Sequence, residues 1–420
     1  MNPLATQLFS RMSFRITVVA VVMLYLAHAL PLYFFNVAVP AILRQQGVDL
    51  RWIGMLSLLY LPWAFKFLWA PVVDRYSSAR LGKRRSWILL TQIAVISGVL
   101  LLAQHTPQHG FWMFIAVGVW ISTFAATQDI AIDGYAIEAF SRDQYSVAST
   151  AQSIGVALGS MIGGAGTLWL YEHYGWQPAL YALAALIGTT TLALIFLKEN
   201  HAVPVDVPQQ ILRVKIKPSI KRVFQRPEIR RLLLVIVIYR VVEAPAMAML
   251  NPMLVDASWS LTQIGVLFSV LGAAVGILAA LSTGKLVKKY GAIYGLIGAG
   301  WLRSVAYGLL ALCLLFGLMN SVALSAAVLV ILAIRYMTMT ALYAYFMQHC
   351  SMGQAGTDFT VLVCVELLIF FLGAAGSGFL AKSLGYGWFF ALLAVLSCVS
   401  VLLSQMLMRP AMISDASSQP

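Results

Sequence analysis

Charged residues are scarce in this chain. Asp, Glu, Lys and Arg make up 10% of its 420 residues, whereas hydrophobic residues make up 61%. The mean hydropathy of +0.85 leaves too little polar surface to cover a water-soluble globule of this length. A soluble domain is therefore excluded, and a membrane-embedded chain is expected.

Cysteines and catalytic motifs are also sparse. The four cysteines (Cys313, Cys350, Cys364 and Cys398) are scattered, with no CxxC pair and no histidine at a zinc-motif spacing. This pattern argues against a disulfide framework or a zinc site. The sequence lacks GxxxxGK(S/T), GxSxG and HExxH, so we expect no ATP-driven transport, no enzyme of these classes, no metal and no cofactor.

Long apolar runs separated by short polar joints fill most of the chain. A helix needs about 20 apolar residues to cross a bilayer. The first run begins near Ile16 and no small-residue cleavage site follows it, so we interpret it as a span and not as a removed signal peptide. We predict twelve spans, at about 16–42, 50–72, 87–104, 111–137, 147–171, 178–197, 232–255, 262–283, 291–318, 322–347, 358–381 and 387–408.

The basic residues follow this topology. With the N-terminus inside, the cytoplasmic segments hold 21 of the 28 Lys and Arg residues. Such an asymmetry sets the orientation of a membrane protein, so we expect both termini in the cytoplasm. The net charge of +13 reflects this topology and predicts no nucleic-acid partner.

The sequence repeats itself at half length. Residues 163–184 align with 373–394 at an offset of 210, and residues 52–56 align with 263–267 at an offset of 211. This repeat predicts two parallel six-span halves, at 1–200 and 232–420, joined by a proline-containing basic linker at 201–231. Such an all-α arrangement with pseudo-symmetric halves is that of the major facilitator fold.

A polar loop follows the second predicted span. Residues 73–76 (VDRY) and 82–85 (GKRR) place an acid before a basic cluster, and 284–291 (GKLVKKYG) occupy the matching place in the second half. A carboxylate near a helix end can pair with a neighbouring helix and hold one side of a transporter closed. We interpret Asp74 and Arg75 as gating residues and not as substrate ligands.

The fourth predicted span carries unusual acids. Asp129 and Asp133 are four residues apart and share one helix face, beside a stripe that contains Gln128 and extends to Glu138 near the end of the span. Two close carboxylates in a poorly solvated site do not both ionise easily, so one of them can carry a proton during transport. The alternative is a structural ion pair, with Lys66 as the partner.

The second half places charges at mid-depth. Arg240 and Glu243 are one turn apart in span 7, Arg335 is followed by Tyr336 in span 10, and Glu366 lies in span 11. Guanidinium groups bind carboxylates well, so Arg240 and Arg335 are candidates for holding an anionic substrate. Arg240 and Glu243 form a self-satisfied pair in the alternative interpretation.

Three further polar sites in apolar spans need interpretation. Tyr33 and Asn36 in span 1 are candidates for lining a cavity, and His28 in the same span is interpreted as a packing residue. Arg303 lies in span 9, which is peripheral in this architecture. We expect its side chain to extend to an interface.

Two motifs carry a family resemblance. Residues 61–71 (LPWAFKFLWAP), with 74–76 (DRY), and residues 128–135 (QDIAIDGY) resemble the AmpG and acetyl-CoA transporter branch of the major facilitator superfamily. At 420 residues, the chain is more similar to the single-protein siderophore permeases of the RhtX/FptX kind than to the longer muropeptide permeases. The resemblance implies a bacterial inner-membrane location, and it places Lys66, Asp129 and Asp133 on the family motifs.

Our hypothesis from the sequence is a gradient-driven, proton-coupled importer of a ferric siderophore that acts as a monomer in the lipid bilayer. A permease for muropeptides or another amphiphilic metabolite is the nearest alternative, and a non-transporting sensor is the next. The candidate proton-coupling residues are Asp129, Asp133 and Glu366, the candidate substrate ligands are Arg240, Glu243, Arg335, Tyr336, Gln128, Tyr33 and Asn36, and the gating or structural residues are Lys66, Asp74, Arg75 and Glu138.

Overall fold

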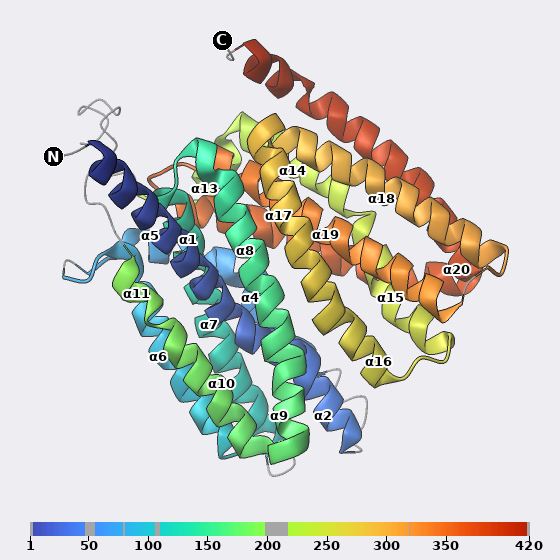
Figure 1. Ribbon diagram of the computed structural model, residues 1–420, viewed down its shortest axis with the longest axis horizontal. Coiled ribbons are helices and arrows are strands. Elements are labelled where there is room, and N and C mark those ends of the chain that lie inside the picture. Colours follow the sequence, from blue (N-terminus) through green and yellow to red (C-terminus); the bar gives the residue numbers. More distant parts are fainter. Residues whose placement is uncertain are drawn as a thin grey trace. The chain divides into compact units, whose positions relative to one another are not determined.

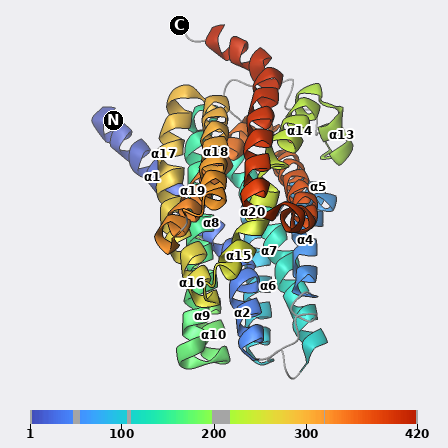
Figure 2. The ribbon, with the colours of Figure 1, turned by 90° about the vertical axis from the view of Figure 1, so that its right-hand side faces the viewer.

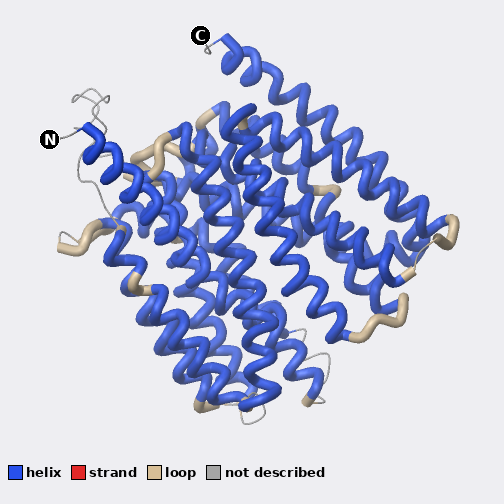
Figure 3. Tube along the Cα trace, in the orientation of Figure 1, coloured by secondary structure: helices blue, strands red, loops and turns tan. Residues whose placement is uncertain are grey.

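The computed structural model describes residues 3–46, 55–78, 80–105, 110–197, 217–318 and 320–417. Within these ranges the protein is helical and contains no β-strand (Figure 3). Two parts of the sequence repeat and of the predicted linker, at 52–54 and 201–216, lie outside the described residues.

Ten helical stretches in the described ranges are long and apolar enough to cross a membrane. One of them, at 355–408, contains a non-helical residue, Gly385, which divides it into two. A shorter apolar stretch, Leu58–Leu68, lies where the second span was predicted. The prediction of an all-α, twelve-helix membrane fold is therefore confirmed.

The chain divides into two compact units, residues Met1–Val223 with Cys350–Val361, and Phe224–His349 with Leu362–Pro420. The short segment 350–361, which belongs to the predicted C-terminal half, is thus grouped with the first unit. The boundaries 1–200 and 232–420 stay a prediction.

The first unit contains the elements up to α13 (Figure 1). In chain order they are α1 (Pro3–Tyr33), the π-helix η1 (Phe34–Ala38), α2 (Val39–Gln45), the 3₁₀ helix η2 (Leu56–Tyr60), α4 (Leu61–Phe65), the 3₁₀ turn η3 (Lys66–Leu68), α5 (Ala70–Arg75), α6 (Lys83–Ala103), α7 (Phe111–Ala139), η5 (Arg142–Gln144), α8 (Tyr145–Gly159), the π-helix η6 (Ser160–Gly166), α9 (Thr167–Tyr174), α10 (Trp176–Thr190), α11 (Ala193–Phe196) and α13 (Ile220–Gln225).

The second unit consists mainly of long helices, of which α17, α18 and α19 pack against one another (Figures 1 and 2). In chain order the elements are α14 (Pro227–Arg240), α15 (Glu243–Asp256), α16 (Leu261–Val266), the π-helix η7 (Leu267–Leu271), α17 (Gly272–Tyr290), α18 (Ala292–Leu315), α19 (Ser321–His349) and α20 (Ala355–Ser417).

The repeat in the sequence is matched by repeated backbone geometry. Gly175 and Gly385, which the repeat aligns, have φ values of 84° and 73° and each separates two consecutive helices. Gly82 and Gly291 both have φ of 92°, and each directly precedes a long helix, α6 or α18. Gly291 also ends α17, whose last turn carries Lys288 and Lys289, so the basic segment predicted as a loop at 284–291 is helical up to Tyr290. Because only glycine adopts such angles without strain, these turns explain why glycine recurs at these places in the two halves.

Helix α1 packs closely on α8 through a row of glycines spaced four residues apart. A Cβ atom on Gly155 would lie 2.8 Å from the carbonyl oxygen of Val22, and one on Gly159 would lie 3.1 Å from the carbonyl carbon of Ala29. Small residues allow two membrane helices to approach at backbone distance. This approach fixes the part of α1 that carries Tyr25 and His28.

Proline residues break the second predicted span into short pieces. Pro62 and Pro71 stand at the first turns of α4 and α5, where their missing N–H groups cost least. Between them the chain forms the 3₁₀ turn that begins at Lys66. The interruption places a lysine inside an otherwise apolar segment, with its side chain buried to 1% exposure.

Candidate functional site

Asp129 on α7 forms the centre of a buried charge cluster in the first unit. Its Oδ2 atom pairs with the Nζ atom of Lys66, and its Oδ1 atom lies 3.3 Å from Nε2 of His28. The lysine ammonium also lies over the ring of Trp63, 5.6 Å from its centroid. The ion pair between Lys66 and Asp129, one of the two alternatives from the sequence, is present. His28 is a partner of this pair and not only a packing residue.

Asp133, one turn along α7, is held differently. Its Oδ1 atom accepts hydrogen bonds from the hydroxyl of Tyr25 at 2.8 Å and from Nε2 of Gln152 at 3.4 Å. Its Oδ2 atom has no hydrogen-bond partner in the described part of the chain, although the residue is only 1% exposed. Neutral donors alone contact this carboxyl group, so it can accept a proton without breaking an ion pair.

A second network of the first unit centres on Arg84, at the start of α6. Its Nε and Nη2 atoms donate to the two carboxylate oxygens of Glu138 at 2.9 and 2.6 Å, and Nη2 lies 2.7 Å from Oδ1 of Asp74. Lys83 pairs with both acids, at 3.7 Å from Asp74 and 3.3 Å from Glu138. The guanidinium group lies on Gly134, where a Cβ atom would come within 2.5 Å of its nitrogens.

Asp74 also anchors the start of α20. Its Oδ2 atom accepts hydrogen bonds from the backbone N–H and the hydroxyl of Thr357, both at 2.6 Å. Burial by itself raises the pKa of the Asp74 carboxyl, but Arg84, Lys83 and the two bonds from Thr357 outweigh it and hold that pKa below its usual range. Asp74 is therefore a charged residue that binds the first turn of a helix, where negative charge is favourable.

The second unit contains an arginine-centred cluster. Arg240, at the end of α14, pairs through Nη1 with Oε2 of Glu243 at 2.6 Å and through Nη2 with Oε1 of Glu366 on α20. All three side chains are at least nine-tenths buried. The self-satisfied pair that was the alternative interpretation of Arg240 and Glu243 is present, and Glu366 extends it.

Arg303 on α18 is buried, and the expectation that it extends to an interface is wrong. Its Nε atom donates to Ser397 at 3.0 Å, and its Nη1 atom donates to the carbonyl oxygen of Tyr239 at 2.9 Å. Its guanidinium carbon lies 4.3 Å from the centroid of the Tyr239 ring. Hydroxyl, carbonyl and aromatic partners on two other helices make an interior position favourable for this charge.

Arg335 on α19 differs from the other arginines of the cluster. It is half-buried, and no ion pair joins it to an acid among the described residues. Its guanidinium carbon lies 5.6 Å from the ring centroid of Phe370. Together with Glu243, Met247, Arg303, Tyr307, Ile331 and Ile334 it lines a narrow gap with an empty volume of about 200 Å³.

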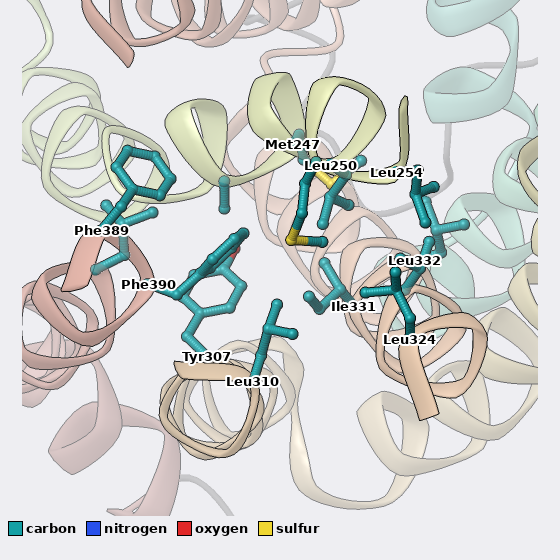
Figure 4. Close-up of a cluster of buried hydrophobic side chains, with 14 of the residues drawn as sticks. Met247, Leu250, Leu254, Tyr307, Leu310, Leu324, Ile331, Leu332, Phe389 and Phe390 are labelled. Atoms are coloured by element: carbon teal, nitrogen blue, oxygen red, sulfur yellow. The ribbon is translucent and has the colours of Figure 1, made fainter. Parts of the chain in front are cut away.

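An apolar cluster forms the wall of this gap. Figure 4 shows Met247, Tyr307 and Ile331, which line the gap, within a set of side chains from α15, α18, α19 and α20. Its other labelled members are Leu250, Leu254, Leu310, Leu324, Leu332, Phe389 and Phe390. A cation beside aromatic and aliphatic walls suits an organic anion better than a fully hydrated one.

Several predicted ligands lie elsewhere. Gln128 is fully buried and donates to Oε1 of Gln92, whose own amide donates to Thr190 at 2.7 Å, so its side chain joins helices and does not face a cavity. Tyr336 packs its ring against α17, where a Cβ atom on Gly276 would lie 2.5 Å away. These two contacts argue for structural roles.

Three more predicted residues lie at the edges of the networks. Arg75 is exposed and lies over the ring of Tyr76 at 5.5 Å, whereas Arg84 takes the contact with Asp74. Tyr33 is half-buried at the end of α1, and Asn36 is exposed in the π-helix η1. In the described part of the chain no group of three or more His, Cys, Asp or Glu side chains is arranged to hold a metal ion.

Several partners in these networks were not predicted from the sequence, among them Arg84, Thr357, Tyr25 and Gln152. Arg84 was grouped with a general basic cluster, and nothing in its neighbours distinguishes it from Arg85. Thr357 contacts Asp74 across 283 positions. Local patterns do not reveal such distant partners.

The helices and their buried charges define a multi-pass membrane transporter. A family model described as Major Facilitator Superfamily matches residues 21–374. The chain belongs to this superfamily.

Individual relatives indicate which branch of the superfamily this chain resembles. The chain is 28% identical over 292 residues to the anhydromuropeptide permease of Escherichia coli (strain K12), which covers 66% of this chain and 59% of that permease. It is 29% identical over 284 residues to the putative transporter AmpG 3 of Rickettsia prowazekii (strain Madrid E), covering 64% of this chain and 66% of the relative. The chain thus aligns with less than two thirds of the length of these relatives.

A solved structure shares the fold. The human organic anion transporter MFSD10 superposes with a TM-score of 0.71 at 17% identity, covering 93% of this chain and 99% of that transporter. The resemblance to AmpG-type proteins stated from the motifs is confirmed by the relatives. The closer resemblance to siderophore permeases stays a prediction.

Proposed function

We propose that this protein is a proton-coupled secondary transporter of a small organic anion of the muropeptide class, located in a bacterial inner membrane. The superfamily is one of transporters, and the relatives of this chain include the anhydromuropeptide permease of E. coli. A muropeptide combines a sugar with a short peptide and so carries carboxylate groups beside less polar parts. This combination matches a guanidinium group next to an apolar wall.

The surroundings of Arg335 are the main support for this proposal. Arg240 is ion-paired with Glu243 and Glu366, and Arg303 is hydrogen-bonded to Ser397 and Tyr239. Arg335 is half-buried and lies over the ring of Phe370, and no ion pair joins it to an acid in the described residues. A half-buried cation without a directly paired acid is unfavourable unless a ligand supplies one. Arg335 is therefore our first candidate for the contact with a substrate carboxylate, with Arg240 as the second.

Asp133 is our candidate for proton coupling. Its carboxyl group has an unpartnered oxygen and only neutral donors, whereas Asp129 is paired with Lys66 and Glu366 with Arg240. A carboxyl group that binds a proton in each cycle must reach both charge states at small cost. Among the three predicted proton carriers, Asp133 fits this requirement best.

The network around Arg84 is our candidate for gating. Asp74 and Glu138 both bind this arginine, and Asp74 holds the first turn of α20 through Thr357. Release of these bonds would free Thr357 and the first turn of α20. In this proposal Arg84 replaces Arg75 as the basic gating residue.

Uptake into inner-membrane vesicles tests the proposal. Vesicles that contain the protein should accumulate a radiolabelled anhydromuropeptide when the pH gradient is imposed, and vesicles without it should not. Arg335→Met should raise KM by at least about 10-fold, because it removes the proposed carboxylate contact. Lys382→Met, which removes an exposed cation of the same unit, is the matched control. Unchanged KM for Arg335→Met would exclude the anchor role.

Import of a ferric siderophore is the second candidate. This candidate rests on the resemblance to single-protein siderophore permeases that was stated from the sequence. A ferric siderophore is also an organic anion. Iron-limited cells that lack the gene should then lose cytoplasmic accumulation of one labelled ferric siderophore from a panel, with normal recycling of cell-wall peptides.

A further inference from the structure

Arg303 is held by hydrogen bonds from each of its three guanidinium nitrogens. Its Nε atom donates to Ser397, its Nη1 atom to the carbonyl of Tyr239, and its Nη2 atom lies 3.5 Å from Oγ of Ser400. Ser397 also accepts a bond of 2.8 Å from Ser304. Because each of its three nitrogens has a fixed partner, Arg303 is unable to follow a moving carboxylate.

Glu243 lies between this fixed cation and Arg240. Its Oε2 atom is 2.6 Å from Nη1 of Arg240 and 3.9 Å from Nη1 of Arg303. Both carboxylate oxygens are buried and lack a hydrogen bond of good geometry in the described part of the chain. Glu243 is thus held by charge but not by directional bonds, so a small rotation of its side chain would bring it to Arg303.

The gap beside these groups is too narrow to hold a water molecule. Glu243, Arg303 and Tyr307 line its empty volume of about 200 Å³, and no part of it admits a water-sized sphere. Met247 and Ile331 of the apolar cluster in Figure 4 form part of its wall. A carboxylate that leaves Arg240 in such a place needs another cation, because water is not there to stabilise it.

Arg240 already holds two carboxylates, Glu243 and Glu366. A substrate anion that binds Arg240 would be the third. We propose that Arg303 is a positioning residue that receives the Glu243 carboxylate when Arg240 binds an anionic group of the substrate. This exchange keeps each buried charge paired throughout, and it rests on the proposed function.

Transport kinetics test the exchange. In the vesicle assay with labelled anhydromuropeptide, Arg303→Gln should raise KM at least 10-fold, and Arg303→Lys should restore most of the loss because it retains a cation. Lys285→Gln, at an exposed position of α17 in the same unit, should leave KM unchanged. A purely structural role would lower the amount of folded protein but leave its KM as it is, and that result would overturn the proposal.

A second test needs no substrate. The interaction between Glu243 and Arg303 is measured as the coupling between Glu243→Gln and Arg303→Gln, from melting temperatures of the purified full chain. The cycle is measured first in the natural protein and then in a variant that also carries Arg240→Met and Glu366→Gln. Loss of Arg240 should move Glu243 onto Arg303, so the coupling should rise in the second background; equal coupling in both would overturn the exchange. Arg240→Lys gives a milder background. If the anhydromuropeptide is not transported at all, the proposed function fails. The coupling measured from melting temperatures still tests whether Glu243 moves from Arg240 to Arg303.

Discussion

In the first unit a lysine and a histidine share one aspartate, whereas in the second unit one arginine holds two glutamates. Asp129 therefore contacts an ammonium group and an imidazole, whereas neutral donors alone contact Asp133 in the described residues. The two buried glutamates of the second unit, Glu243 and Glu366, both pair with Arg240. A proton can join Asp133 without breaking an ion pair, but in the second unit it would break one.

This difference suggests that proton coupling and anion binding belong to different units. Asp129, Asp133 and Glu366 were all predicted to couple protons, but only Asp133 has a carboxyl group free of direct ion pairs in the described residues. The second unit is better suited to bind an anion, because Arg335 forms no direct ion pair in the described residues and Arg303 lies 3.9 Å from Glu243. Substitutions in each unit test this difference.

The largest effect is expected for Arg240→Met. It leaves Glu243 and Glu366 buried without their shared cation, and breaking a buried pair costs about 3–5 kcal/mol. The free energy of unfolding should fall by that amount in detergent, measured by thermal denaturation. Addition of Glu366→Gln should recover part of the loss. A stable single variant would mean that the cluster is not held by Arg240.

Lys66→Met should cost less, near the lower end of that range at about 3 kcal/mol. His28 lies 3.3 Å from the same aspartate and can become protonated to replace the lost charge. The double variant Lys66→Met and His28→Phe should therefore be less stable than the two single losses predict. Additive losses would show that His28 does not share in the pairing.

Asp74→Asn tests a carboxylate that works only when charged. Its bonds to Arg84 and Thr357 should contribute about 1.5–3 kcal/mol. Since the folded-state pKa of Asp74 is lowered from the usual 3.8, this stability is fully present above pH 3.8 and is lost as the pH falls through the lower folded value. Melting curves between pH 3 and 7 should show a smaller acid loss in Asp74→Asn than in the unmodified protein. An equal loss of stability at low pH in the two proteins would contradict the proposal that charged Asp74 stabilises the fold.

Asp133→Asn should have the smallest effect on stability, within about 1 kcal/mol, because its amide oxygen can still accept the bond from Tyr25. Uptake driven by a pH gradient should nevertheless be lost, while binding of the labelled probe is retained. The control is Glu366→Gln, which should lower stability more because it removes the charge that pairs with Arg240. Normal pH-driven uptake by Asp133→Asn would transfer the proton role to another group.

The fold could be predicted from the sequence because a lipid bilayer requires long apolar helices. The internal repeat indicated that a six-helix half is duplicated. Of the site, the charged residues in apolar spans were found, since each of them is costly in a bilayer. The partners of these charged residues were not predicted. Arg303 was misplaced because Ser397 lies 94 positions away along the chain, and Gln128 was assigned to a cavity because its stripe on α7 does not show that α6 covers it.

Three π-helical turns in the described part of the chain, η1 (Phe34–Ala38), η6 (Ser160–Gly166) and η7 (Leu267–Leu271), affect how the length of this chain can change. A π turn accommodates one residue more than the α-helical ladder around it. Deletion of one residue there restores a regular helix, whereas a deletion in the middle of α7 would rotate all following side chains by about 100°. Natural relatives of different length are thus expected to gain or lose single residues at these turns, without turning the polar face of the next helix toward lipid.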